Sequence, residues 1–584
     1  GSLRALLIQR LGVTEYSVSA NQFFRASLAG ELSRSTHLNS CALIHLQGIV
    51  THEKSGARAL DVNIYGVDDT FFKFQNATNQ EAPRDREAMA GFPLAQRLGM
   101  KPGDSLLLRI ETGQGVPRES LYGRKENIGK TVRLTCKRIL PSDNLGEFSL
   151  RPTQGDVYSF FVPLSRLQND LSQPARANMV LLTGSSNDAA QQIEAALEGN
   201  VTLRDLGVHL RPTTSQSGFM VESTRILLDD SIAQAALKAA EEAGTKSSGV
   251  FTYLANSIRA GGREIPYSVI TAADLRQGAM DAVADVAGMT GRPVRVDGEP
   301  IWLNEWAWRD LAIAPGESVE IDYYLWEEEG RLTTRTSRFR FAGAVAIGGD
   351  VDAALAPDFP GITEARSIRD WDPPFPLDLR RIRPKDEDYW NRYRATPKAF
   401  ITLARGQELW QSRFGRYSAV RIAVPEGADP NLTKERLETG IRNRVRPDST
   451  GFRINAVRER GLEAARGSTD FGEYFVYFSF FLIAAALLLA ALFFRLGIEQ
   501  RAREIGTLLA MGFSMNAVRR IFLLEGAVLS IAGSALGLIG AVVYGALLVF
   551  GLGNWWIDAV GTRSVTLHVS WLDLISGAAA GILA

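Results

Sequence analysis

Long runs of apolar residues dominate the last part of this chain. No charged residue occurs over the 21 positions Tyr474–Phe494 or the 28 positions Gly526–Gly553. A helix of about 20 apolar residues crosses a membrane core of about 30 Å, so each run is long enough to span one. A third run, Trp571–Ala584, is mostly apolar and stops after 14 residues. The pattern predicts a transmembrane domain, 471–584, with spans at about 474–494 and 521–553 and a truncated span at 571–584.

Before residue 471 the pattern changes to short alternating elements. Strand-like runs rich in apolar and β-branched residues predict strands at Cys41–Thr51, Leu60–Tyr65, Ser105–Ile110, Thr131–Leu140, Asn178–Thr183, Glu317–Leu325, Thr334–Val345 and Ser418–Val424. Helical spacing of apolar residues predicts helices at Gly1–Gly12, Asn187–Leu197, Asp230–Ala243, Leu275–Ala287 and Leu432–Val445. Mixed elements of this kind favour the α+β class, expected here as sandwiches with at least partly antiparallel sheets.

Two pairs of segments resemble each other in the same order along the chain. Pro93–Ile110 matches Trp306–Tyr323 at an offset of 213 residues, and Phe161–Leu171 matches Phe400–Trp410 at an offset of 239. Co-linear matches favour a duplicated module. The alternative is that a helix, a Pro-Gly turn and a strand recur in unrelated units, because Pro-Gly suits any tight turn.

The difference between the two offsets falls at a Pro-rich insert, 356–397, with seven prolines. We therefore predict a first α+β module at 1–200 and a second at 201–470 that contains the insert. The insert also holds four large aromatic residues, Trp371, Phe375, Tyr389 and Trp390. It is either an ordered loop packed by these aromatics or a docking surface for a partner, since long ordered loops often carry function.

The distribution of charge orients the predicted spans. The segment 495–520 between the first two spans contains Arg495, Arg501, Arg503, Arg519 and Arg520 against Glu499 and Glu504. The loop after the second span carries only Asp558 and Arg563, with Trp555 and Trp556 at its edge. Arg-rich short loops stay in the cytoplasm and Trp residues favour the interface. The segment 495–520, called the hinge from here on, is therefore predicted to lie in the cytoplasm, and both modules are predicted to lie outside it.

Composition argues against several classes of function. The chain has 65 basic and 65 acidic residues, so no basic excess indicates nucleic-acid binding. The two cysteines, Cys41 and Cys136, are expected as buried strand residues, with a single disulfide as the alternative. None of the five histidines is spaced as a metal ligand, and no nucleophile elbow or phosphate-binding loop occurs. We expect no catalytic, metal-binding or cofactor-binding residue in this chain.

The membrane part contains three patterns that suggest a mechanism. Gly533, Gly537, Ala541 and Gly545 recur every four residues, which favours close packing against another helix, unless glycine is simply frequent in membrane helices. Glu525 lies one turn into the second span, where we expect it to pair with the hinge or with Arg519 or Arg520 of a neighbour rather than to carry protons.

The hinge itself is amphipathic, with Gly512 predicted to stop one helix and Ser514 to cap the next. A short helix between two spans either receives force from a soluble partner or only joins the spans.

A resemblance to a known family rests on the hinge. Its residues are Arg503-Glu504-Ile505-Gly506, Ala510-Met511-Gly512-Phe513-Ser514, and Arg519 followed by Leu523-Leu524-Glu525. Together with Ser468–Gly472 and the Lys101–Asp104 turn, they resemble the FtsX-like permeases of ABC transporters, the family that includes MacB. The match is specific over about 468–550 and diffuse before it.

The resemblance implies four membrane helices per permease unit and a MacB-like extracytoplasmic domain between the first two. This chain would then lack the first helix and most of the fourth. ATP would be bound by a separate ATPase subunit that contacts Glu504, Ile505, Gly506, Met511, Gly512, Arg519 and Arg520. Further expected partners are the lipid bilayer, a second permease copy or half, and a periplasmic adaptor or hydrolase.

The expected function is a permease subunit in the bacterial inner membrane that relays ATP-driven motion to its external modules, for efflux or for lipoprotein or lipid export. Two alternatives from other classes stay open: a transmembrane scaffold that regulates an external cell-wall hydrolase, and an external sensor.

Overall fold

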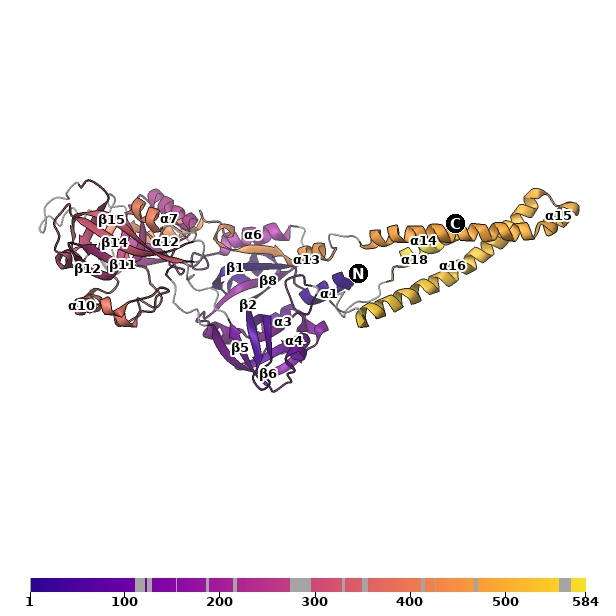
Figure 1. The fold of residues 1–584 in the computed structure, drawn as a ribbon, viewed down its shortest axis with the longest axis horizontal. Coiled ribbons are helices and arrows are strands. Elements are labelled where there is room, and N and C mark those ends of the chain that lie inside the picture. Colours follow the sequence, from indigo (N-terminus) through magenta and orange to yellow (C-terminus); the bar gives the residue numbers. More distant parts are fainter. Residues whose placement is uncertain are drawn as a thin grey trace.

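The structure, a computed structural model, describes residues 2–583 apart from 111–120, 123–128, 154, 185–187, 214–217, 274–295, 328–330, 349–354, 411–414, 426, 467–470 and 556–568. Two sheet-based bodies and a set of long helices follow one another along the longest axis (Figure 1). The first sheet lies between the second sheet and the long helices. The helix predicted at Leu275–Ala287 and the residues Trp556, Asp558 and Arg563 lie outside the described residues.

The first sheet has nine strands in the order β18-β1-β8-β2-β3-β7-β4-β6-β5. β2 also pairs with β5, so the six strands from β2 to β5 close into a barrel. The other three strands extend this sheet on one side. The bounds of the nine strands are β1 Tyr16–Arg25, β2 Asn39–His52, β3 Arg58–Val67, β4 Glu87–Gly91, β5 Ser105–Ile110, β6 Lys130–Leu140, β7 Ser159–Pro163, β8 Arg176–Thr183 and β18 Arg453–Ala456.

The second sheet has nine strands in the order β12-β16-β13-β15-β14-β11-β17-β10-β9. β11 pairs with both β12 and β14, which again closes six strands into a barrel and leaves three outside it. The bounds are β9 Val208–Pro212, β10 Gly218–Ser223, β11 Ser247–Ala260, β12 Arg263–Ala273, β13 Pro300–Asn304, β14 Ser318–Trp326, β15 Leu332–Val345, β16 Ala399–Thr402 and β17 Ala419–Ala423.

The two sheets share one topology. Strands β1 to β8 correspond in chain order to β10 to β17, and the parallel pairs β3–β7 and β4–β6 correspond to β12–β16 and β13–β15. Details recur at the predicted offset of 213: the register of β4 shifts at Ala88/Met89 and that of β13 at Ile301/Trp302. Gly103 and Gly316 have φ of 96° and 92° in matching turns. A shared topology with matching irregularities supports the predicted duplication, which as a statement about origin stays a prediction.

If the chain is divided into the matching series β1 to β9 and β10 to β18, the last strand of each series pairs in the other sheet. β9 pairs with β10 in the second sheet, although its residues follow the helix of the first sheet. β18 pairs with β1 in the first sheet, and Figure 1 shows this orange strand beside indigo β1. β18 lies within the predicted second module, 201–470, in sequence but in the first sheet in space.

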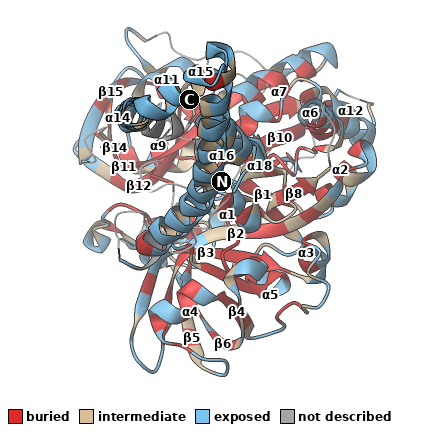
Figure 2. Ribbon diagram, turned by 90° about the vertical axis from the view of Figure 1, so that its right-hand side faces the viewer, coloured by how far each residue is buried: buried red, intermediate tan, exposed pale blue. Residues whose placement is uncertain are grey.

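Helices cover the strands that lie outside the barrels. α2 (Leu28–Thr36) contacts α6 (Ala189–Asn200) over the first sheet, and α7 (Asp230–Glu242) contacts α12 (Pro430–Arg442) over the second. One continuous apolar cluster joins both helix pairs through residues such as Val18, Ile193, Ile232 and Leu437. The red strands and the inner faces of these helices in Figure 2 mark this core.

All eight predicted strands are present within two residues at each end, and the α+β class followed by apolar helices is confirmed. The expected sandwich arrangement is wrong, because six strands of each sheet close into a barrel. The longest strand pair, β11–β12, was not predicted, since its burial is nearly continuous and gives no alternation. Cys41 and Cys136 are free and buried in β2 and β6, as expected. Burial raises the pKa of Cys41 to about 12 and that of Cys136 to about 11.

The Pro-rich insert folds against the second barrel. It contains α10 (Pro384–Tyr393), and its four large aromatics, Trp371, Phe375, Tyr389 and Trp390, are all buried. Trp371 and Trp390 meet edge to face at 4.9 Å. The aromatics pack the loop itself and are not displayed to a partner, which agrees with the ordered-loop alternative.

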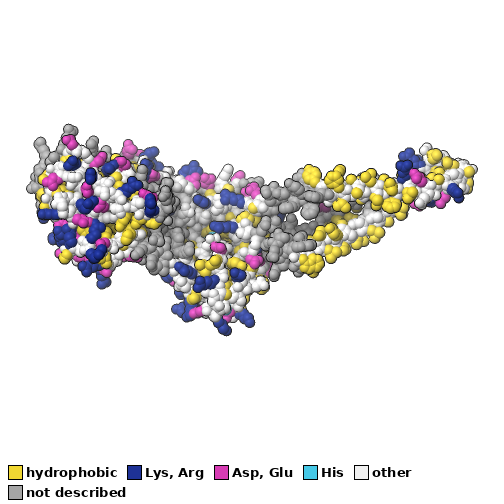
Figure 3. Space-filling model, in the orientation of Figure 1, with side chains coloured by type: hydrophobic (Ala, Val, Ile, Leu, Met, Phe, Trp, Pro, Cys, Tyr) yellow, Lys and Arg dark blue, Asp and Glu magenta, His cyan; other side chains and the backbone are white. Residues whose placement is uncertain are grey.

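Three long or apolar helices follow the globular part (residues 2–466). They are α14 (Phe471–Gln500), α16 (Met515–Asn554) and α18 (Trp571–Leu583), with the short α15 (Ala502–Ala510) between the first two. Within the described residues, Ser479–Gln500 and Met515–Gly551 are long and apolar enough to cross a membrane. Figure 3 shows hydrophobic side chains along these helices and charged ones at the tip where α15 lies.

Candidate functional site

The hinge between α14 and α16 is built by two local signals. Gly512 has φ of 97°, a conformation that ends the helical turn after α15. The Ser514 hydroxyl then accepts a hydrogen bond from the backbone N–H of Ala517, capping α16. Both local roles were predicted from the sequence. They place α15 across the tip of the two long helices as a separate short element (Figure 1).

Arg501 holds this tip together. Its guanidinium donates to both carboxylate oxygens of Glu525, at 2.6 and 2.8 Å, and to Glu504 at 2.7 Å. It also lies 5.0 Å from the ring centre of Phe522. One side chain therefore links the end of α14 to the first turn of α15 and to α16. Glu525 pairs with the hinge as expected, and the partner among its arginines is Arg501.

Sequence reasoning did not single out Arg501. The available signal was the spacing of Arg501 and Glu504, three residues apart, which suits an ion pair on a helix. Its contact with Glu525 depends on the turn at Gly512, which folds α16 back beside α14. An apolar cleft of about 330 Å³ lies between these two helices, and its lining includes Phe494, Phe522 and Glu525.

The residues predicted to contact an ATPase are distributed over two helices and the turn between them. Glu504, Ile505 and Gly506 lie on α15, and Met511 and Gly512 form the turn. Arg519 and Arg520 lie on α16 rather than on the short helix. All except the half-buried Ile505 are exposed, and Met511 is 62% exposed beside exposed Phe513 and Met515. The tip thus presents an apolar ridge flanked by charges.

Two members of the predicted small-residue row on α16, Gly533 and Gly537, face open space among the described residues. A Cβ atom added at Gly533 or Gly537 would find nothing within 4 Å. Ala541 is exposed, and Gly545 is half-buried. α18 contacts α16 along a different line, where the Ser530 hydroxyl donates to the backbone oxygen of Gly581 at 3.0 Å.

A second site lies where the globular part meets the long helices. α1 (Ser2–Leu11) packs against α13 (Val457–Arg466), the helix that precedes α14. Leu7, Leu11 and Val457 form a buried cluster between them. A Cβ atom at Gly461 would lie 2.7 Å from Leu7, so glycine is needed for this close approach.

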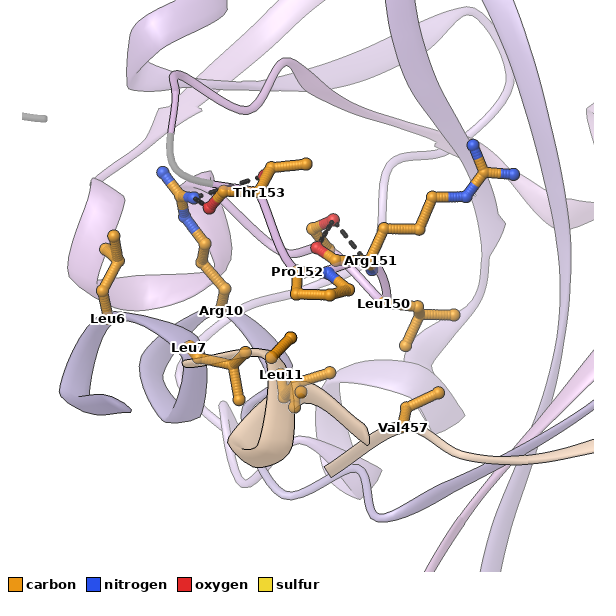
Figure 4. A pocket seen from close by; sticks show the side chains of 12 residues that line it. Leu6, Leu7, Arg10, Leu11, Leu150, Arg151, Pro152, Thr153 and Val457 are labelled. Atoms are coloured by element: carbon orange, nitrogen blue, oxygen red, sulfur yellow. Dashed lines mark hydrogen bonds between the residues drawn. The ribbon is translucent and has the colours of Figure 1, made fainter. Parts of the chain in front are cut away.

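A buried ion pair attaches α1 to the first barrel. Arg10, 5% exposed, donates from Nε to Glu147 at 2.9 Å and from Nη1 and Nη2 to the backbone oxygens of Thr153 and Gly155 at 2.6 and 2.9 Å. Beside it lies a cavity of about 100 Å³ with leucine walls, shown in Figure 4, where Arg10 points toward Thr153 and Arg151 points away. Sequence reasoning missed this pair because its members lie 137 residues apart.

Comparisons with known proteins bear on the membrane part. Residues 476–584 match the family model described as FtsX-like permease C-terminal. No curated protein matches the chain.

Two solved structures show a low likeness. The periplasmic region of MacB from Actinobacillus actinomycetemcomitans has 11% identity and a TM-score of 0.22, over 33% of this chain and 86% of that one. The extracellular domain of the noncanonic ABC-type transporter YknZ from Gram-positive bacteria has 11% identity and a TM-score of 0.21, over 32% of this chain and 94% of that one.

Proposed function

We propose that this chain, whose residues 476–584 match the C-terminal region of FtsX-like permeases, is the membrane-spanning permease subunit of an ABC-type transporter. It relays ATP-driven motion of a separate ATPase subunit to its large globular part. ATP is bound by the ATPase and not by this chain. The globular part lies outside the bacterial inner membrane and the hinge lies in the cytoplasm, since basic residues gather at the hinge.

The observation that carries this proposal is the exposed tip. Met511, Phe513 and Met515 are exposed at this tip, next to its charged side chains. Apolar side chains ringed by charges fit a protein interface, where a desolvated apolar centre is bordered by polar groups. Arg501 ties this surface to both long helices, so a push on α15 reaches them.

The remaining partners follow from the same proposal. The open small-residue row at Gly533 and Gly537 packs against a second permease copy or half, because small residues let membrane helices approach closely. The cargo is a drug or peptide for efflux, or a lipoprotein or lipid for export, with a periplasmic adaptor where efflux applies. Regulation of an external hydrolase is the alternative function, with the insert as its candidate docking surface; the four large aromatics of the insert are buried.

Capture of an ATPase tests the proposal. We expect the full chain in detergent to retain a purified ABC ATPase subunit of its host, and Glu504→Lys to lower the retained amount about tenfold or more, because a reversed charge meets the same interface. Glu435→Lys, an exposed carboxylate on α12, is the matched control and should retain the ATPase fully. If no host ATPase is retained by the unaltered chain, the permease proposal fails.

A further inference from the structure

The exchange of edge strands between the two sheets joins them in an unusual way. In a split β-α-β unit, the strand after the second helix returns to the edge of the first strand of its own sheet. Here the strand after α6 is β9, which lies beside β10, and the strand after α12 is β18, which lies beside β1. The series β1 to β9 therefore completes the second sheet with its last strand, and the series β10 to β18 completes the first sheet with its last strand.

Two crossing segments make this exchange, the first at residues 201–207 and the second at 443–452. Both are held by β1 at the point where its register with β8 shifts. The Gln22 side-chain amide lies there and donates to the backbone oxygens of Asp205 and Thr450, at 3.3 Å each. A single buried side chain of β1 thus contacts both crossing segments.

Further contacts fix each segment to β1. The Arg25 guanidinium donates to the fully buried carboxylate of Asp205 at 2.9 Å, in the first crossing segment. Phe452, in the second, lies 5.4 Å from Phe24 between ring centres. Charge-assisted bonds to a buried carboxylate are among the stronger contacts in proteins. β1 is accordingly the strand on which both sheets depend.

The same strand lies next to the connection between the globular part and the long helices. α1 leads directly into β1, and β18 leads directly into α13, after which the chain continues to α14. α1 and α13 contact each other, and Arg458 of α13 pairs with Glu15 at 3.0 Å. A displacement of α14 therefore acts first on α13 and β18, and through the second crossing segment on α12 of the second sheet.

β18 is also the weakest-held strand of this region. It has four residues, pairs with β1 alone, and has no fully buried residue. Short, half-exposed edge strands open and shift at low free-energy cost compared with core strands.

We propose that the β18–β1 pair is the joint through which motion of the membrane helices reaches both external sheets. When the ATPase changes its nucleotide state, β18 shifts against β1, and the crossing segments carry this shift to both sheets together. This inference rests on the proposed function for its driving force, and it assigns a transmission role to an element outside the membrane.

A cross-link between the two strands tests the joint. Ser19 and Arg453 lie directly opposite each other in register, so the double variant Ser19→Cys/Arg453→Cys places two thiols across the pair. The native Cys41 and Cys136 are buried and do not compete. The protein is reconstituted into vesicles with its ATPase, and disulfide formation is timed without nucleotide and with ATP and vanadate.

We expect the rate of cross-linking to change at least about threefold between the two states. The control is Glu320→Cys/Arg338→Cys, a cross-strand pair within the β14–β15 hairpin, whose rate should not change. Equal rates in both states at β18, with the ATPase bound, overturn the joint and leave the permease proposal intact. Failure of the ATPase to bind overturns both.

Hydrogen exchange of the unaltered protein tests the same joint without depending on the folding of the double variant. The amides of residues 453–456 should exchange faster in the vanadate-trapped state than without nucleotide. Unchanged exchange at these amides overturns the joint even if the double variant fails to fold.

Discussion

Replacing Arg10 with methionine should lower the free energy of unfolding of the globular part by about 3–5 kcal/mol. The change removes the partner of Glu147, whose side chain is only 11% exposed, and leaves a carboxylate without compensation in a nearly dry site. It also removes the donors to the backbone oxygens of Thr153 and Gly155. Urea unfolding of the full chain in detergent, followed by far-ultraviolet circular dichroism, measures the loss.

A matched set of variants isolates the cause. The double variant Arg10→Met/Glu147→Leu should recover the part of the loss that comes from the uncompensated carboxylate, because an apolar pair can replace a buried ion pair at little cost. Arg338→Met breaks the exposed pair with Glu320 and should cost about 1 kcal/mol or less. If Arg10→Met costs no more than Arg338→Met, the attachment of α1 does not depend on the buried charge pair.

Lys398 should make the stability of the second sheet rise with pH between about 8 and 10.5. This side chain is 4% exposed, and its ammonium lies 5.0 and 4.8 Å from the ring centres of Trp306 and Tyr389. Burial lowers its pKa from 10.5 to about 8, with Asp386 and Asp310 opposing the shift and Arg383 adding to it. The folded protein therefore loses the proton before the unfolded chain does.

The direction of this pH dependence follows from the number of protons that the folded and unfolded states bind. Between pH 8 and 10.5 the unfolded chain holds more protons on this lysine than the folded protein, so the free energy of unfolding increases with pH. We expect a gain of roughly 2 kcal/mol between about pH 7.5 and 9.5 relative to Lys398→Met, which cannot titrate. Comparison with the variant cancels the opposing contribution of Cys41 and Cys136, whose raised pKa values favour the folded state less as pH rises.

The control for this prediction is Lys238→Met, an exposed lysine on α7. It should keep the pH dependence of the unaltered protein. Parallel curves for Lys398→Met and the unaltered protein between pH 7.5 and 9.5 would contradict the lowered pKa.

Features that depend on residues close together in sequence were predictable. The two long apolar helices, the stop at Gly512 and the cap at Ser514 each follow from a run or a residue type within one or two turns. The matching turns at Gly103 and Gly316 were found for the same reason, because a turn that contains Pro-Gly depends on only four consecutive residues.

Features that depend on pairing between distant residues were not predictable. Arg501 meets Glu525 only because the chain reverses between them, and Arg10 meets Glu147 across most of the first sheet. Barrel closure likewise depends on β2 pairing with β5 and β11 with β12, and strand propensity does not specify which edges meet.

The sequence by itself determined eight of the strands, the class of the fold, the two long apolar helices and the charged hinge, because local propensity and apolar spacing act within a few residues. Only the tertiary structure decided that β9 and β18 exchange sheets. Both are short strands with little pattern of their own, and their places are set by Gln22, Arg25 and the shared apolar core that receives them. The packing of that core, rather than the position of each strand along the chain, determines which sheet each strand joins.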